Sequence, residues 1–63
     1  MLEYFKTILA KVSFDRWLFE KELRKAIKSL IPTEIIKLKE WCIEQYGHIY
    51  SSIIKKCFAT RMI

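Results

Sequence analysis

The sequence predicts an all-α protein, a compact bundle of three to four short antiparallel helices, and two observations support this fold class. The 63 residues include one glycine and one proline, so few positions favour turns or helix breaks. Apolar residues recur at spacings of three and four along most of the chain, which is the period of an amphipathic helix. A chain of this length forms one domain, so we predict a single helical domain over residues 1–63.

The first helix is expected over residues 2–12. Leu2, Phe5, Leu9 and Val12 repeat at intervals of three and four, and Ile8 widens the apolar face. One side of this helix is therefore expected to pack against the rest of the bundle.

The second helix is expected from about Arg16 to Leu30, and two residues before it are candidate N-caps. The carboxylate of Asp15 can accept hydrogen bonds from the free backbone amides of the first turn, and Ser13 is the competing cap. Phe14 and Phe19 have the spacing of a hydrophobic staple across this helix start.

The second helix has an apolar face and a basic face. The apolar side chains fall on one side at 100° per residue: Phe19, Leu23, Ala26, Ile27 and Leu30. The opposite side carries four cations, which we call the basic stripe: Lys21, Arg24, Lys25 and Lys28. Trp17 projects near the basic stripe, so we expect an exposed aromatic side chain there.

The third helix is expected to begin at Pro32, which suits a first helical position because its missing N–H would have no partner there. Glu34 then lies in the first turn, where the helix dipole favours an acid. Gly47 is placed to terminate the helix in a left-handed conformation, so the predicted end is Tyr46. The apolar side chains span over half the circumference and predict a central helix: Ile35, Ile36, Leu38, Trp41, Cys42, Ile43 and Tyr46.

The remaining segment, "HIYSSIIKKCFATRMI", predicts a fourth helix with two apolar ridges. Ile49, Ile53 and Cys57 form one ridge, and a second ridge runs one residue further along. The sequence leaves open whether residues 49–63 form a packed helix or a mobile tail.

Catalytic and metal sites are not predicted, and we expect no enzyme activity and no cofactor. The single histidine, His48, has no evident partner to tune its pKa. Cys42 and Cys57 lie on apolar faces, where free cysteine behaves as a small hydrophobic residue. These three candidate ligands lack the closely spaced pairs of a zinc site, and a single glycine cannot build a phosphate-binding loop.

The net charge of +5 favours nucleic acid as one alternative partner. The basic stripe could contact phosphates, although Glu20 can pair with Arg24 and solvation of the helix surface would explain the stripe equally well. A helix-turn-helix is disfavoured, because its second helix should read bases whereas the predicted third helix is mostly apolar and net acidic. Membrane binding is not expected, since the apolar side chains of the last segment suit a protein core equally well.

Protein–protein interaction is the function that needs the fewest assumptions. Hydrophobic residues make up 52% of the chain, more than one small core requires, and surplus apolar surface marks interaction sites. We therefore predict a homodimer formed through the third helix and one terminal helix, with another protein as a further possible partner. The candidate interface residues are Trp17, Trp41, Ile43, Tyr46, Tyr50 and Phe58.

The expected compartment is the cytoplasm, with both thiols reduced. Two cysteines do not make a disulfide framework of the kind found in small secreted domains. Charged residues interrupt the first twelve positions, so a signal peptide is unsupported, and no apolar run approaches the length of a membrane-spanning helix.

Overall fold

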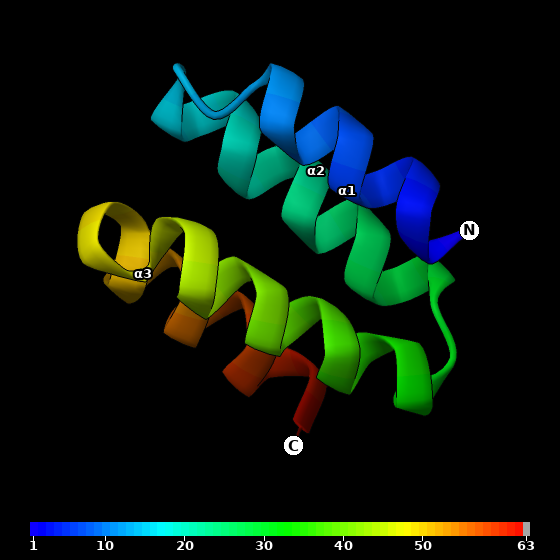
Figure 1. Cartoon of the computed structure of the whole chain (residues 1–63). Helices are drawn as coiled ribbons and strands as arrows, with labels where there is room; N and C mark the ends of the chain where they lie inside the picture. Colours follow the sequence, from blue (N-terminus) through cyan, green and yellow to red (C-terminus); the bar gives the residue numbers. More distant parts are fainter. Residues whose placement is uncertain (63) are drawn as a thin grey trace.

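The computed structural model describes the backbone of residues 1–62 and the side chains of residues 1–59. Over that part, the chain forms three helices, α1 (Leu2–Lys11), α2 (Arg16–Ser29) and α3 (Pro32–Met62), and contains no strand. Figure 1 shows α1 lying along α2, with α3 below them, and each pair of helices is in contact. The all-helical class predicted from the sequence is confirmed.

The start of α2 is capped by Asp15, as the sequence predicts. One carboxylate oxygen accepts hydrogen bonds from the backbone N–H groups of Trp17 and Leu18, at 3.0 and 3.2 Å. The Ser13 hydroxyl instead donates to a carbonyl in the last turn of α1. The predicted hydrophobic staple between Phe14 and Phe19 is wrong: the Phe14 side chain is 80% exposed, whereas Phe19 is fully buried.

The third helix does not end at Tyr46, so the predicted terminating role of Gly47 is wrong. Gly47 has no positive φ, and the helical backbone continues through it. A single glycine costs an α-helix only about 1 kcal/mol relative to alanine. The core contacts of residues before and after Gly47 in the chain can offset this cost. The non-helical residue is Tyr50, with φ −118° and ψ 29°, and Figure 1 shows the ribbon of α3 turning back on itself at this end.

The segment after the turn packs against the rest of the molecule. Ile53, Ile54, Cys57 and Phe58 are each at most 4% exposed. The question that the sequence left open is therefore answered for the described side chains beyond the turn: residues 51–59 form a packed helix and not a tail. The side chains of the last four residues lie outside the described part.

The core draws on all three helices and on both halves of α3. Among the side chains described, its fourteen members are Phe5, Leu9, Phe19, Leu23, Ala26, Ile27, Leu30, Ile35, Leu38, Cys42, Ile53, Ile54, Cys57 and Phe58. The radius of gyration is 10.2 Å, close to the roughly 11 Å expected for a compact domain of this length. The chain thus encloses a closed core without a second copy.

Candidate interaction surfaces

The candidate interface residues named from the sequence divide into three groups in the structure. Trp17 and Ile43 are exposed. Trp41, Tyr46 and Tyr50 are partly buried and pack against the core. Phe58 is 1% exposed, so this side chain belongs to the core and is not available on the surface of the folded chain. The prediction failed because sequence periodicity alone does not show which neighbour an apolar ridge meets. The six residues therefore do not form one patch.

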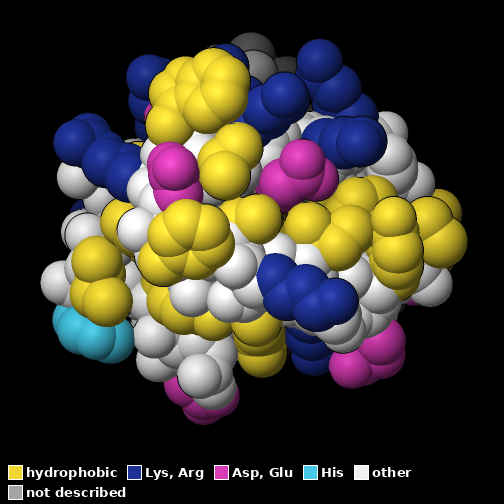
Figure 2. Space-filling view, turned by 90° about the horizontal axis from the view of Figure 1, so that it is seen from above, with side chains coloured by type: hydrophobic (Ala, Val, Ile, Leu, Met, Phe, Trp, Pro, Cys, Tyr) yellow, Lys and Arg dark blue, Asp and Glu magenta, His cyan; other side chains and the backbone are white. Residues whose placement is uncertain are grey.

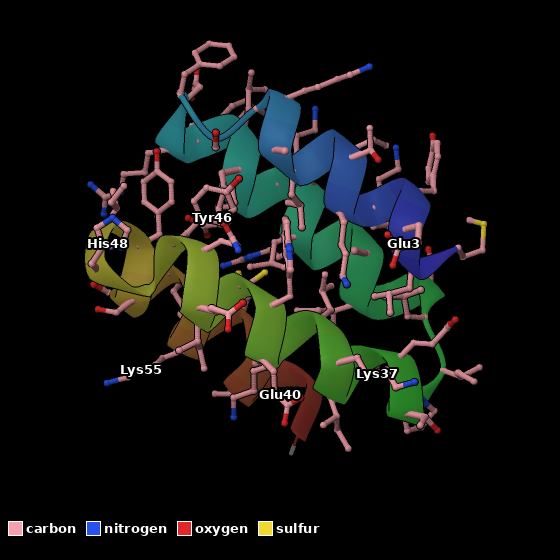
Figure 3. The ribbon with its side chains drawn as sticks, viewed as in Figure 1. Glu3, Lys37, Glu40, Tyr46, His48 and Lys55 are labelled. Carbon is pink, nitrogen blue, oxygen red and sulfur yellow. The ribbon has the colours of Figure 1, made fainter. Side chains whose placement is uncertain are left out.

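The partly buried aromatic residues form a cluster around Phe19. The ring centroid of Phe19 lies 5.2 Å from that of Tyr46 and 4.8 Å from that of Tyr50. Trp41 contacts Tyr46 edge to face, with centroids 5.6 Å apart. Figure 3 shows Tyr46 pointing from α3 toward the other helices. Such aromatic pairs add to the stability of the fold beyond the area they bury, so we assign this cluster to folding.

Tyr50 also joins the turn in α3 to the connection between α1 and α2. Its hydroxyl donates a hydrogen bond of 2.6 Å to the backbone carbonyl oxygen of Ser13. This contact links residues that are 37 positions apart. It holds the turn at Tyr50, three residues beyond the glycine that was expected to end the helix.

The basic stripe is an exposed surface of α2. Lys21, Arg24, Lys25 and Lys28 are all exposed, and at 100° per residue they lie within about 100° of one another around the helix. Trp17 falls in line with them and is 69% exposed. Figure 2 views the side of α1 and α2, and shows Lys and Arg side chains gathered beside exposed apolar side chains.

Two cations of the stripe have partners of their own. The Lys21 Nζ lies 5.5 Å from the centroid of the Trp17 ring, within the range of a cation–π contact. Arg24 forms the predicted pair with Glu20, at 2.8 Å between Nη2 and Oε2. The same carboxylate oxygen lies 3.8 Å from Lys56 Nζ on α3. Lys25 and Lys28 pair with no acid among the described side chains, so they hold the least compensated charge of the stripe.

A shallow pocket lies at the N-terminal end of the stripe. It has a volume of about 230 Å³ and is lined by Trp17, Glu20, Lys21 and Arg24. Small-molecule and cofactor sites usually enclose about 300–1,000 Å³, so this pocket is small for such a ligand. Its size suits one side chain of a binding partner.

The two cysteines are buried thiols and not activated nucleophiles. Burial raises the pKa of Cys42 to about 12, the neighbouring Cys57 adds to the rise, and Lys6 opposes it. Burial also raises the pKa of Cys57, although a hydrogen bond from Arg24 opposes this. A reactive cysteine needs a lowered pKa and access to solvent. No group of three or more histidine, cysteine or acidic residues that could hold a metal occurs within the described part of the chain.

The outer side of α3 carries a pair of exposed apolar residues. Sequence periodicity alone did not distinguish them from the core residues of the same helix. Ile36 and Ile43 are 59% and 51% exposed, and their spacing of seven places them on one helix face. Lys37, Glu40 and Glu44 are exposed beside them, and Figure 3 shows Glu40 pointing away from α1 and α2. The broad apolar surface predicted for this helix is thus only partly covered. Their i, i+7 spacing was the sequence signal that could have identified this exposed pair.

Searches against protein-family models, curated protein sequences and solved structures gave no match for this chain. None of the helices, over the residues described, is long and apolar enough to cross a membrane. Over the described residues the chain is a small all-helical domain, and two of its exposed features are the apolar pair on α3 and the basic stripe with Trp17 on α2.

Proposed function

We propose that this protein is a small non-catalytic interaction protein that assembles with a second copy of itself. The observation that supports the proposal is the closed core combined with eight large hydrophobic side chains, among those described, that are each at least 51% exposed. These side chains are not needed to complete the core. Exposed apolar surface on a small domain is characteristic of interaction sites.

The outer face of α3 suits a two-fold symmetric contact. In such a contact residue i of one copy meets residue j of the other, the reverse pairing follows by symmetry, and residues next to the axis meet their own counterparts. Two antiparallel copies of α3 centred between residues 39 and 40 would place Ile36 opposite Ile43 of the second copy. The same register brings Lys37 close to Glu44 of the second copy, so opposite charges meet at the edge of the apolar contact.

The native mass tests this proposal directly. Size-exclusion chromatography with light scattering over a protein concentration series is expected to give a dimer that dissociates on dilution. Ile43→Glu should shift the mass to a monomer, because it places an acid in the apolar contact. Ile49→Glu is the matched control: Ile49 is 61% exposed but points about 120° away from Ile43 around the helix, so the dimer should persist.

Charge exchange provides a second test of the register. Lys37→Glu should weaken the dimer, because it would meet Glu44 of the second copy, and adding Glu44→Lys should restore it. A wild-type chain that stays monomeric at the highest concentration would refute self-association. Equal dissociation by Ile43→Glu and Ile49→Glu would refute the assigned face.

A second candidate function is nucleic-acid binding through the basic stripe. It is favoured by the exposed, uncompensated Lys25 and Lys28 on the same face as Trp17, because lysines make sequence-independent contacts with phosphates. Fluorescence anisotropy with labelled duplex and single strands at low salt tests it. Binding that weakens steeply with added salt would support this function, and the absence of binding at micromolar protein would exclude it.

A further inference from the structure

We propose that the basic stripe and the pocket beside Trp17 together bind an acidic helical segment of a partner protein, with one apolar side chain of that segment seated in the pocket. This surface lies on α2, whereas the proposed self-association uses the outer face of α3. The two proposals therefore succeed or fail independently.

Trp17 has the properties of an anchor for a protein partner. Its side chain is 69% exposed, although it is a large aromatic ring on a helix that has a complete apolar face of its own. Tryptophan and arginine are enriched among the residues that dominate binding energies at protein interfaces. Trp17 and Arg24 both line the 230 Å³ pocket, so an apolar side chain entering it would contact the indole ring and the aliphatic part of a flanking cation.

The charges of the stripe match an acidic helix in spacing. Lys21, Lys25 and Lys28 follow one another at intervals of four and three residues, over about 10 Å along the α2 axis at 1.5 Å per residue. Acidic side chains at i, i+4 and i+7 of a partner helix have the same spacing. Lys25 and Lys28 have no acidic partner among the side chains described, so a bound acid would not have to displace an existing ion pair there.

Glu20 makes the pocket less suitable for a nucleotide phosphate. Its carboxylate lines the pocket and is held there by Arg24 at 2.8 Å and Lys56 at 3.8 Å. A phosphate in the pocket would lie beside this negative charge, and Arg24 is already engaged. Single-stranded nucleic acids also bind by stacking successive bases on several aromatic rings, whereas Trp17 is the one exposed aromatic residue of α2. An apolar side chain avoids both difficulties.

The test uses a fluorescein-labelled synthetic peptide of about eleven residues, three turns, which is covalently constrained to a helix because free helices of this length are marginal in water. It has glutamates at i, i+4 and i+7 and a phenylalanine one turn before the first glutamate. The matched peptide has alanine in place of phenylalanine, and a single-stranded oligonucleotide of equal charge serves as the competing ligand. Binding is measured by anisotropy at low salt with the full chain.

We expect the phenylalanine peptide to bind at least tenfold more tightly than the alanine peptide and than the oligonucleotide. Trp17→Ala should abolish the preference for phenylalanine while leaving residual, salt-sensitive binding. The double variant Lys25→Glu/Lys28→Glu should weaken both peptides at least tenfold. These residues are exposed, so the variants are expected to keep the wild-type circular dichroism spectrum.

The control variant Lys11→Glu/Lys55→Glu changes the net charge equally but lies off the stripe, and Figure 3 shows Lys55 pointing away from the other helices. It should retain most of the affinity, and Ile43→Glu on α3 should leave peptide binding unchanged. Equal affinity for the two peptides, tighter binding of the oligonucleotide, or equal loss in the stripe and control variants would overturn the proposal.

Discussion

Replacing Tyr50 by phenylalanine tests whether a single hydroxyl group holds the turn in α3. The change removes the 2.6 Å hydrogen bond to the Ser13 carbonyl and leaves the ring, which stacks on Phe19 at 4.8 Å. A hydrogen bond between neutral groups contributes about 0.5–1.5 kcal/mol net to stability. Ser13 is only partly buried, so water can reach its carbonyl oxygen after the change, and we expect a loss of about 1 kcal/mol.

Tyr46→Phe is the matched control for this experiment. Tyr46 belongs to the same aromatic cluster, but its hydroxyl makes no hydrogen bond with any described residue. Its replacement should change the free energy of unfolding by less than about 0.5 kcal/mol, as for substitutions that remove no specific contact.

Urea unfolding followed by circular dichroism, at one fixed protein concentration, measures both variants. A loss of 1 kcal/mol in a domain of this size lowers the melting temperature by about 4–8 °C. The m-value should stay constant, because the buried area is unchanged. A Tyr50→Phe variant as stable as the wild type, or a Tyr46→Phe variant destabilised to the same extent, would refute the assigned role of the hydroxyl.

Four further changes test other parts of the fold. Gly47→Ala should stabilise the protein by about 0.4–1 kcal/mol in urea unfolding, because the backbone at this position is helical. The added Cβ would lie 3.5 Å from Ile43 Cγ2, an ordinary van der Waals distance. A loss of stability would contradict a helical Gly47. Asp15→Ala should cost about 1 kcal/mol by the same assay, whereas Asp15→Asn, which can still cap the helix, should cost much less. Phe58→Ala should cost about 3–5 kcal/mol, enough to unfold much of a marginal domain, which the far-ultraviolet spectrum would show. The pKa of Cys42 is raised from 9.0 to about 12, so the contribution of the neutral thiol to stability is complete below pH 9 and is lost as the pH rises towards 12. The urea midpoint of the wild type should therefore fall over this pH range, and Cys42→Ala should reduce the fall. An unchanged pH profile in the variant would contradict the buried thiol.

The first two helices could be predicted almost completely because their signals are local. The Asp15 cap depends on atoms two and three residues away, and the apolar face of α2 follows from its own period. Within the candidate site, the exposure of the basic stripe, the Glu20–Arg24 pair and the position of Trp17 follow from the same helical geometry. Sequence within one helix was sufficient for each of these.

The remaining features depend on residues that are distant in the sequence. The end of the helix was placed at Gly47 on local preference, whereas the turn occurs at Tyr50, where Phe19 and Ser13 hold the ring and its hydroxyl. Periodicity marked Ile36 and Phe58 equally as apolar ridge residues, yet one is exposed and the other is buried. Only the packing of the two halves of α3 against the other helices decides between these outcomes.

The reversal of the chain at Tyr50 also determines when the domain can fold during its synthesis. Four of the fourteen core side chains lie beyond the turn: Ile53, Ile54, Cys57 and Phe58. Until these residues leave the ribosome, α1, α2 and the first half of α3 would expose the apolar surface that they later cover. At about 5–20 residues per second, the eight residues that follow Tyr50, up to Phe58, take about two seconds or less to synthesise, and the apolar surface of the preceding helices stays uncovered at least until they are added.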